Sequence, residues 1–564
     1  MPTLRQPKAT PAPPVRNSGA SALRPSNQPA SKRLQVPVPH TVGAWPRQLL
    51  SVGFATLMLC LLAVLNGQPF FYPDTATYVR GADMGITKLL GPRFATAWAP
   101  QAAEAAAAAA QNKDGEVSLP AVPPARRFTS IEDKLVMAGR SVYYGALLYL
   151  GYVSSDLWLV VVMQALGAAY LLHLLMVRLW AIRPPAFIAT VGALTLFTPL
   201  SAFAGLLMPD VFAPLIILAV ATLAVYWVRL GRADRVALAV IMTFGLVSHP
   251  SHLALAVALL LPVCAARMLS RKARRLSIAG LSLAIACVAA GFAAEWLFFK
   301  AVTVAIGQPP LRMPHPMARL IDMGPGTAFL EATCPGSSYA ACAYVGNFPT
   351  PWVDFIFSAD PSKGAFTLAD AETKRRISGE QFPFLLDVVR FDPLTVARGL
   401  SADLLHQLVM FRVDILGYRN EALRYGARLP PETFKTLLQS RAADKSNPWD
   451  RNLSLATHVS VFAALLIALG LAVSLPQRRV LFAAEAGSAW SDFTLFTSLV
   501  VAGVVSNALV CASLASPFDR FQARVIWLLP FLALVALAIV RDTTARARPS
   551  IAPPGTGNSL AART

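Results

Sequence analysis

The sequence predicts an all-α polytopic membrane protein with about ten transmembrane helices and two large outward-facing loops. Of its 564 residues, 55% are hydrophobic and only 14% are charged, and the mean hydropathy is +0.52. Soluble domains carry roughly 25% charged residues. The apolar residues also fall in long blocks with almost no charge, and about 20 such residues are needed for a helix to cross the hydrocarbon core. These observations exclude a soluble domain with a tail.

Ten apolar blocks are the expected membrane helices. They cover residues 48–66, 157–179, 186–207, 210–228, 236–248, 252–268, 276–298, 455–475, 491–513 and 524–540. Residues 236–268 form one apolar stretch that is too long for a single upright span, and the sequence SHPSH interrupts it. Because Pro250 has no backbone donor and clashes with the preceding turn, we expect two short spans joined at His249–His252.

Basic loops indicate which ends of these spans are cytoplasmic. The segments RLGRADR (229–235), RMLSRKARR (267–275) and PQRR (476–479) are basic, whereas the turns at 207–210 and 248–252 contain no lysine or arginine. Cytoplasmic loops carry an excess of lysine and arginine. The pattern therefore predicts that both termini lie in the cytoplasm, which requires an even number of spans, and that the outward loops are periplasmic if the source is a Gram-negative bacterium.

The spans divide the chain into regions with different expected environments. Residues 1–47 form a basic cytoplasmic tail, whose Pro, Ser and Ala content cannot bury enough apolar surface to fold. A membrane core (48–299) includes a first periplasmic loop (67–156), within which residues 139–153 could lie along the membrane surface. A periplasmic loop domain (300–454), C-terminal membrane helices (455–540) and a cytoplasmic tail (541–564) follow. The net charge of +20 comes from clusters at the termini and between apolar blocks, so we expect no nucleic-acid partner.

The six cysteines fall into two groups. Cys334 and Cys342 flank the polar segment CPGSSYAAC, so a disulfide is expected if this loop is periplasmic, and two free thiols are the alternative. The other four lie in apolar blocks and are expected to be small packing residues. They are Cys60, Cys264, Cys287 and Cys511.

Ionisable residues gather at the outer ends of the spans, where burial costs several kcal/mol unless the group is solvated or paired. They are Asp74 in YPDTATY, Asp210 in LMPDVFAP, His249 and His252 in SHPSH, Glu295 with Lys300, and Asp519, Arg520 and Arg524 in SPFDRFQAR. Arginine holds a phosphate bidentately, and a carboxylate can accept a proton from a hydroxyl group. The set is typical of a site for a phosphorylated lipid.

Each candidate also has a structural interpretation. Asp74 and Asp210 each follow a proline and suit helix N-caps, and the histidines could satisfy loop carbonyls. Two histidines three positions apart also suggest zinc, but no third ligand is evident, so no metal or cofactor is expected. Arg520 and Arg524 share one helix face and could bind lipid headgroups or pair with Asp519. Glu295 and Lys300 are expected to form part of a boundary ion pair.

The layout resembles the GT-C class of membrane glycosyltransferases, in particular bacterial members that use polyprenyl-phosphate sugars. The resemblance covers roughly residues 48–300 and rests on short motifs. It implies that Asp74 is the catalytic base and that Asp210 is the second acidic residue, which opens the fourth span. His249-Pro250 stands where the class often has Lys-Pro. The class often has a paired acidic motif at this place. Here Asp74 stands alone, because the next acidic residue, Asp83, lies nine residues further along the chain.

The predicted function is therefore transfer of a sugar from a polyprenyl-phosphate donor to an unknown acceptor at the periplasmic face, in contact with membrane lipid. Here Arg520, Arg524, His249 and His252 would hold the lipid phosphate. A transporter or flippase for a lipid-linked substrate is one alternative. It predicts internal repeats and charges deep within the spans, and the sequence shows no repeat. A non-catalytic assembly protein is the other alternative.

Overall fold

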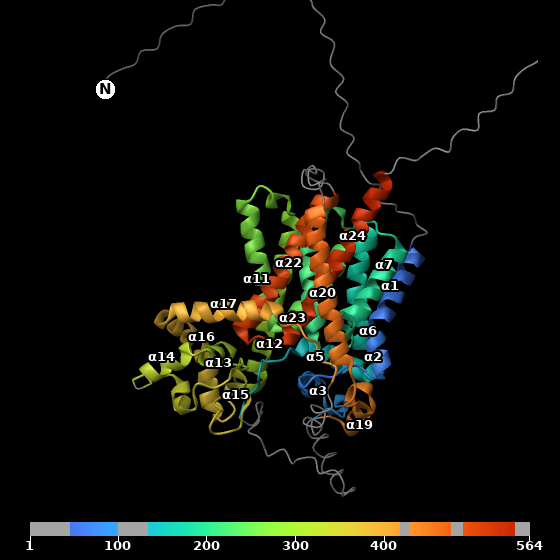
Figure 1. Ribbon diagram of the computed structural model, residues 1–564. Coiled ribbons are helices and arrows are strands. Elements are labelled where there is room, and N and C mark those ends of the chain that lie inside the picture. The colour runs from blue at the N-terminus through green and yellow to red at the C-terminus, as the bar shows by residue number, and fades with distance from the viewer. Residues whose placement is uncertain (1–44, 100–132, 335, 418–428, 475–488, 548–564) are drawn as a thin grey trace, which may run out of the picture. The chain divides into compact units, whose positions relative to one another are not determined.

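A computed structural model describes residues 45–99, 133–334, 336–417, 429–474 and 489–547. The chain divides into two units, Met1–Pro46 and Arg47–Thr564, and almost all of the described residues belong to the second. The regular elements within the described ranges are all helices, with only two isolated β-bridges (Figure 1). The two expected tails fall largely outside the described residues, at 1–44 and 548–564, as do parts of three expected loops, at 100–132, 418–428 and 475–488.

Among the described residues, seven helical segments are long and apolar enough to cross a membrane, which makes the chain a multi-pass membrane protein. They are Trp158–Leu179, Pro209–Arg229, Pro250–Leu269, Ile278–Ile306, Trp449–Val473, Trp490–Leu514 and Asp519–Arg541. The corresponding helices are α6 (Trp158–His173), α9 (Phe212–Tyr226), α11 (Pro250–Leu269), α12 (Ile278–Ile306), α20 (Trp449–Ser474), α22 (Ala489–Leu514), and α23 (Asp519–Ile526) with α24 (Leu528–Ala547). Each corresponds to one of the ten predicted blocks.

The other three predicted spans form shorter or broken helices. Residues 48–66 divide into α1 (Trp45–Leu59) and α2 (Leu61–Asn66). The block at 186–207 divides into α7 (Pro184–Phe197) and α8 (Leu200–Gly205), with Pro199 between them. α10 (Arg232–Ser248) has 17 residues. A total of ten spans therefore remains a prediction. If both termini lie on the same side of the membrane, the total must be even, so one or all three of these segments must cross in addition to the seven long helices.

Helix α9 lies at the centre of the core. Nearly all of its side chains are buried, because it is apolar on every face and packs against α6, α10, α12 and α22. At the periphery, α20 leaves Leu455, Val459 and Phe462 more than half exposed, as expected for a helix that faces lipid. The membrane core is thus arranged around α9.

Two helices from the first outer loop pack closely against each other and against the bundle. α3 (Thr75–Leu90) contacts α5 (Val142–Ser155) at Gly145, where an added Cβ would lie 2.6 Å from the backbone oxygen of Tyr78. Ser141 caps α5 by accepting hydrogen bonds from the backbone amides of Tyr143 and Tyr144. One face of α5 is buried, including Tyr144 and Leu148, whereas Leu150 and Val153 are exposed, so its position along the membrane surface stays a prediction. The glycine contact fixes α3, and therefore the residue that precedes it, Asp74.

The second outer loop forms a separate hydrophobic cluster. It contains α13 (His315–Met323), α14 (Pro325–Thr333), α15 (Trp352–Phe357), α16 (Ala371–Phe391) and α17 (Pro393–Val409), followed by the smaller α19 (Pro431–Gln439). Phe329, Phe355 and Phe384 are buried at its centre. Cys334 and Cys342 are joined by a disulfide, with their Cα atoms 5.4 Å apart.

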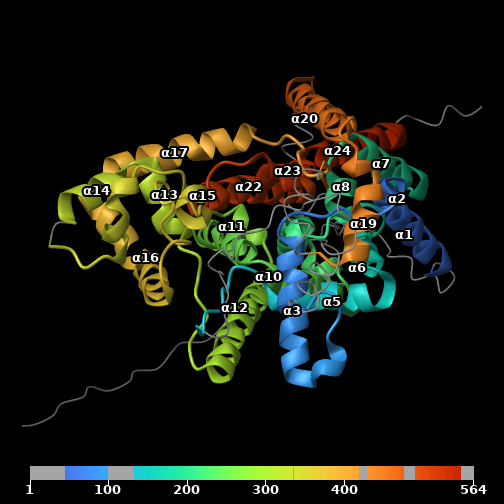
Figure 2. The same ribbon diagram turned by 90° about the horizontal axis from the view of Figure 1, so that it is seen from below.

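This loop domain is attached to the turn between α22 and α23. The indole nitrogen of Trp352 donates to Ser516 Oγ at 2.7 Å. The side-chain amide of Gln407 donates to the backbone oxygen of Phe518 and accepts from its backbone N–H, both at 2.9 Å. Seen from below, α13, α15 and α17 lie beside α22 (Figure 2). The domain is therefore positioned against α22, and α17 also contacts α23, which carries the predicted arginines.

Candidate functional site

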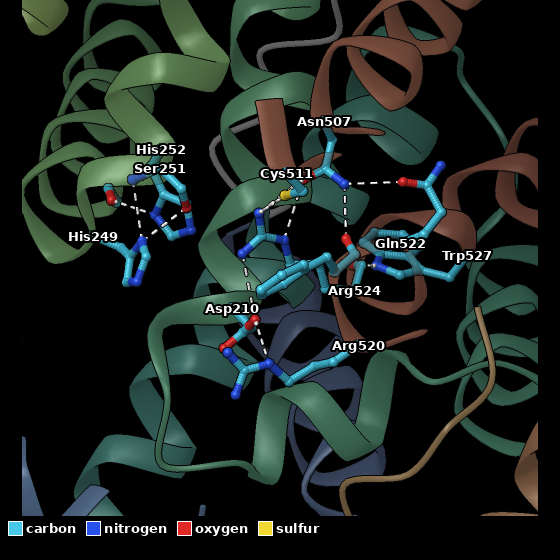
Figure 3. A network of polar contacts seen from close by, with 12 residues as sticks. Asp210, His249, Ser251, His252, Asn507, Cys511, Arg520, Gln522, Arg524 and Trp527 are labelled. Carbon is cyan, nitrogen blue, oxygen red and sulfur yellow. Dashed lines mark hydrogen bonds and ion pairs between the residues drawn. The ribbon is translucent and has the colours of Figure 1, made fainter. Parts of the chain in front are cut away.

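Asp210 and the two predicted arginines form one buried ion cluster. Asp210 lies in a single 3-10 turn (Pro209–Val211) that opens the α9 span, and it is only 3% exposed. Its Oδ1 lies 3.7 Å from Nε of Arg520 and 3.4 Å from Nη1 of Arg524. Figure 3 shows the carboxylate between the two guanidinium groups. The structure thus brings together three residues that the sequence suggested only separately.

Arg524 is also held by α22. The amide oxygen of Asn507 accepts from Arg524 Nε at 3.2 Å and from Nη2 at 2.9 Å, and Cys511 Sγ lies 3.3 Å from Nη2 (Figure 3). Asn507 in turn donates to Gln522 Oε1 at 3.0 Å. Sequence reasoning missed Asn507, although an amide inside an apolar span was a signal, and it interpreted Cys511 only as packing. These contacts make Arg524 mainly a structural cation.

Arg520 has unused hydrogen-bonding capacity. Its guanidinium carbon lies 4.1 Å from the ring centroid of Tyr72, within the range of a cation–π contact. Its Nη1 is buried and has no hydrogen-bond partner among the described residues. A buried donor left unpaired costs about 1–3 kcal/mol. Arg520 is thus oriented by Asp210 and Tyr72 but leaves one donor free for a ligand.

Asp74 pairs with a cation that sequence reasoning missed, Arg140. Asp74 occupies the N-cap position of α3, but its side chain makes no capping hydrogen bond, so the capping interpretation of this carboxylate is wrong. Instead its Oδ1 lies 2.5 Å from Arg140 Nη2, and both side chains are 25% exposed. Arg140 Nε is buried without a partner among the described residues. Burial acts to lower the pKa of Arg140, but Asp74 and Tyr78 outweigh it, so the net shift is upward.

Backbone contacts couple the two acidic segments. The backbone N–H of Phe70 donates to the oxygen of Gly205 at 2.9 Å, and that of Leu207 donates to the oxygen of Phe70 at 2.8 Å. Thr75 Oγ1 adds a bond to the oxygen of Leu207 at 3.1 Å. The segments before Asp74 and before Asp210 are therefore held side by side, and Asp74 lies close enough to Arg520 to influence it electrostatically.

The two predicted histidines lie at the turn between α10 and α11. His249 Nδ1 contacts Ser251 Oγ at 2.8 Å, and His252 Nδ1 contacts the oxygen of Gly245 at 2.8 Å. His252 therefore satisfies a backbone carbonyl, as the structural interpretation held, whereas His249 contacts the hydroxyl and the backbone N–H of Ser251 instead. His252 Nε2, however, is buried without a partner among the described residues. Burial, His252 and the nearby arginines hold the pKa of His249 well below its usual value, so His249 is neutral at pH 7.

A further histidine, His315, comes from the loop domain. It lies at the start of α13, and its ring centroid is 5.5 Å from that of Trp352. Burial and then Arg140 lower the pKa of His315 to about 4, although Asp74 acts in the opposite direction. His315 was missed because nothing in the linear sequence connects residue 315 with Asp74. Within the described residues, no three His, Cys, Asp or Glu side chains are arranged to hold a metal ion.

A small apolar groove borders the site at Arg140. Its walls come from α5, α10, α11 and α12, with Arg140 and Glu295 among mainly apolar neighbours. The apolar lining includes Val142, Leu246, Leu253, Phe298 and Phe299. Glu295 pairs with Arg312 at 2.9 Å and not with Lys300, so the predicted boundary ion pair has a different partner. Arg140 thus belongs to both the groove and the Asp74 ion pair.

The site contains charges of both signs. Arg140, Arg520 and Arg524 lie with Asp74 and Asp210, and Asp414 is also close enough to Arg520 to interact with it electrostatically. What the site leaves open is hydrogen-bonding capacity on two guanidinium groups, Arg520 and Arg140, and such donors favour an anionic ligand. Comparison of the chain with protein-family models, curated proteins and solved structures returns no match.

Proposed function

We propose that this protein binds the phosphate of a lipid-linked substrate beside Arg520 and Arg140, and that it transfers a sugar from a polyprenyl-phosphate donor to an acceptor hydroxyl. One observation carries the proposal: Arg520 Nη1 and Arg140 Nε are buried without acceptors among the described residues. A phosphate oxygen would satisfy such donors with charge-assisted hydrogen bonds. Phosphate recognition by guanidinium groups is the chemistry that this geometry supports best.

The apolar surroundings of Arg140 support a lipid-linked ligand over a soluble phosphate. Arg140 lines the groove together with Leu246, Leu253 and Phe298 on helices α10, α11 and α12. Two of these helices, α11 and α12, are candidate membrane spans. An apolar chain lying along these helices would therefore place its charged end beside Arg140.

In the proposed reaction, Asp74 acts as the base. Its Oδ1 is paired with Arg140, while Oδ2 has no hydrogen-bond partner among the described residues. Oδ2 of Asp74 would take the proton of the acceptor hydroxyl while the oxygen of that hydroxyl forms a bond to the sugar carbon. The bond from that carbon to the phosphate oxygen breaks, and the departing polyprenyl phosphate keeps the electron pair. Arg520 would stabilise the charge that develops on the leaving group.

The test uses the full chain in lipid nanodiscs with a panel of polyprenyl-phosphate sugars and candidate acceptors, and it measures release of free polyprenyl phosphate. Loss of a general base reduces rates by about 10²–10⁴-fold, so we expect a loss of this size in Asp74→Asn. Asp156→Asn is the matched control, because Asp156 is exposed and has a left-handed backbone that asparagine tolerates.

A binding measurement separates the two halves of the proposal. Polyprenyl phosphate should bind to Asp74→Asn nearly as well as to the wild type, and much more weakly to Arg520→Gln. Binding without release from any donor would reject sugar transfer and favour a transporter or an assembly protein. Equal binding to wild type and Arg520→Gln would reject the phosphate site itself.

A further inference from the structure

Helix α17 lies across the direction of the membrane spans. Figures 1 and 2 both show it running sideways from the bundle, away from the outer end of α22. Its C-terminal part is fixed there by the two hydrogen bonds between Gln407 and Phe518, which belongs to the turn between α22 and α23. A turn that connects two spans lies at a membrane boundary. α17 therefore extends from the bundle at the level of that boundary.

The exposed side of α17 carries large apolar side chains, together with Arg398 and with Ser401, whose hydroxyl donates to the backbone oxygen of Ala397. Its outward face contains Leu394, Leu405 and Val409, which are 58%, 67% and 66% exposed. The spacings of 11 and 4 residues place all three on one side of the helix. Ala397 and Ala402 on the same side are exposed as well.

The inward face of α17 carries the polar groups. Gln407 is fully buried in its bonds to Phe518, and Asp403 forms an ion pair with Arg319 of α13. Val396 is buried in the loop-domain cluster. The large apolar side chains of the exposed side have no partner in the part of the chain that the structure describes, whereas the polar groups of the opposite side are satisfied within it. This contrast favours an apolar environment for the exposed side.

We propose that α17 is an interfacial helix whose outward face is embedded in the outer leaflet of the bilayer. An interfacial helix lies in the membrane plane with its apolar face at the boundary between headgroups and acyl chains. Arg398, exposed and four residues after Leu394, is placed to extend to a lipid phosphate while its stem covers apolar surface. Lipid is favoured over a protein partner because the face is continuous with the end of a membrane span, α22.

This inference is independent of the proposed sugar transfer, since it depends on neither Asp74 nor Arg520. It gives the loop domain two attachments to the membrane region: the α22–α23 turn at one end of α17, and lipid along the rest of the helix. The domain would thereby be held over the site, to which it contributes His315.

The test measures the depth of a spin label in nanodiscs. The parent chain carries Cys264→Ala, because Cys264 is half-buried while the other free cysteines are buried and Cys334 and Cys342 are in the disulfide. Single cysteines are introduced and labelled as Leu405→Cys on α17, Leu466→Cys on α20 and Lys363→Cys in the loop domain. Leu466 is 51% exposed within a candidate span, and Lys363 lies in an exposed turn.

We expect the label at 405 to resemble the one at 466, with several-fold greater access to dissolved oxygen than to a water-soluble nickel complex. The label at 363 should show the opposite preference. Access of the nickel complex to position 405 equal to that at 363 would overturn the proposal. Shielding of position 405 from both reagents would overturn it too, because it would mean that protein and not lipid covers this face.

Discussion

Replacing Asp210 by asparagine should destabilise the protein far more than the same change at Asp74. Asp210 is 3% exposed and is shared by Arg520 and Arg524, which are 13% and 4% exposed. Breaking a buried ion pair by removing one partner costs about 3–5 kcal/mol, because a charge stays buried without compensation. In this variant Arg524 keeps its hydrogen bonds to Asn507, so Arg520 is the cation that mainly loses compensation. We therefore expect the free energy of unfolding to decrease by a value near the lower limit, about 3 kcal/mol.

The Asp74–Arg140 pair gives the contrast. Both side chains are 25% exposed, so water can replace much of the lost interaction, and Asp74→Asn should cost about 1 kcal/mol or less. Denaturant unfolding in detergent micelles, followed by tryptophan fluorescence, measures both variants. Trp527 is a suitable reporter because its indole donates to the backbone oxygen of Arg524 at 3.0 Å.

A double variant checks the cause. If the unpaired cation is responsible, Asp210→Asn with Arg520→Met should be more stable than Asp210→Asn alone, since it removes the uncompensated charge. Equal stability of the two single asparagine variants, or no recovery in the double variant, would refute the reasoning. Either result would mean that Asp210 and Arg520 do not depend on each other for burial.

Two further predictions concern the packing and the ionisation of the site. Gly145→Ala on α5 should destabilise the protein by about 1–3 kcal/mol, because the new Cβ would press on the backbone of Tyr78 in α3. Gly81→Ala, on α3 itself, has open space around the new Cβ and should be neutral or stabilising. Thermal unfolding of both variants tests the difference. Burial lowers the pKa of His315 from 6.5 in the unfolded chain to about 4 in the folded protein. Between these pH values only the unfolded chain binds the proton, so the stability should decrease as the pH falls from 6.5 to 4, by up to about 1.4 kcal/mol per pH unit. The stability of His315→Gln should decrease less than that of the wild type between pH 7 and pH 5, as measured by unfolding midpoints at the two pH values. An identical decrease in both proteins would exclude His315 as the cause.

The membrane helices were the most predictable part of the structure. Seven predicted blocks correspond to long helices because about 20 uncharged residues leave the backbone few alternatives in lipid. The breaks were harder to predict. Pro199 was visible, but the division of 48–66 at Cys60 involves no proline or glycine and depends on the packing around it. The close contact of one face of α5 with Tyr78 was also missed, because it depends on a neighbouring helix.

The site was predictable only in its parts. Asp210, Arg520 and Arg524 stood out because each is an ionisable residue at the end of an apolar block. Their pairing depends on α23 packing beside α9, and no local pattern encodes that contact. Arg140 and His315 lie outside the predicted spans, where an ionisable side chain is common. They could be identified as site residues only once the fold placed them near Asp74. The catalytic role of Asp74 and the phosphate-binding roles of His249 and His252 remain predictions.

The distance along the chain between Asp210 and its cations has a consequence for biosynthesis. Asp210 and Arg524 are 314 residues apart, so a growing chain exposes the carboxylate to the translocation machinery long before either arginine has been made. During that interval the fourth predicted span must enter the bilayer with its acid hydrated or protonated. Assembly of the membrane domain is complete only when the last span arrives, and a product truncated before α23 would retain an unpaired acid that quality-control proteases can recognise.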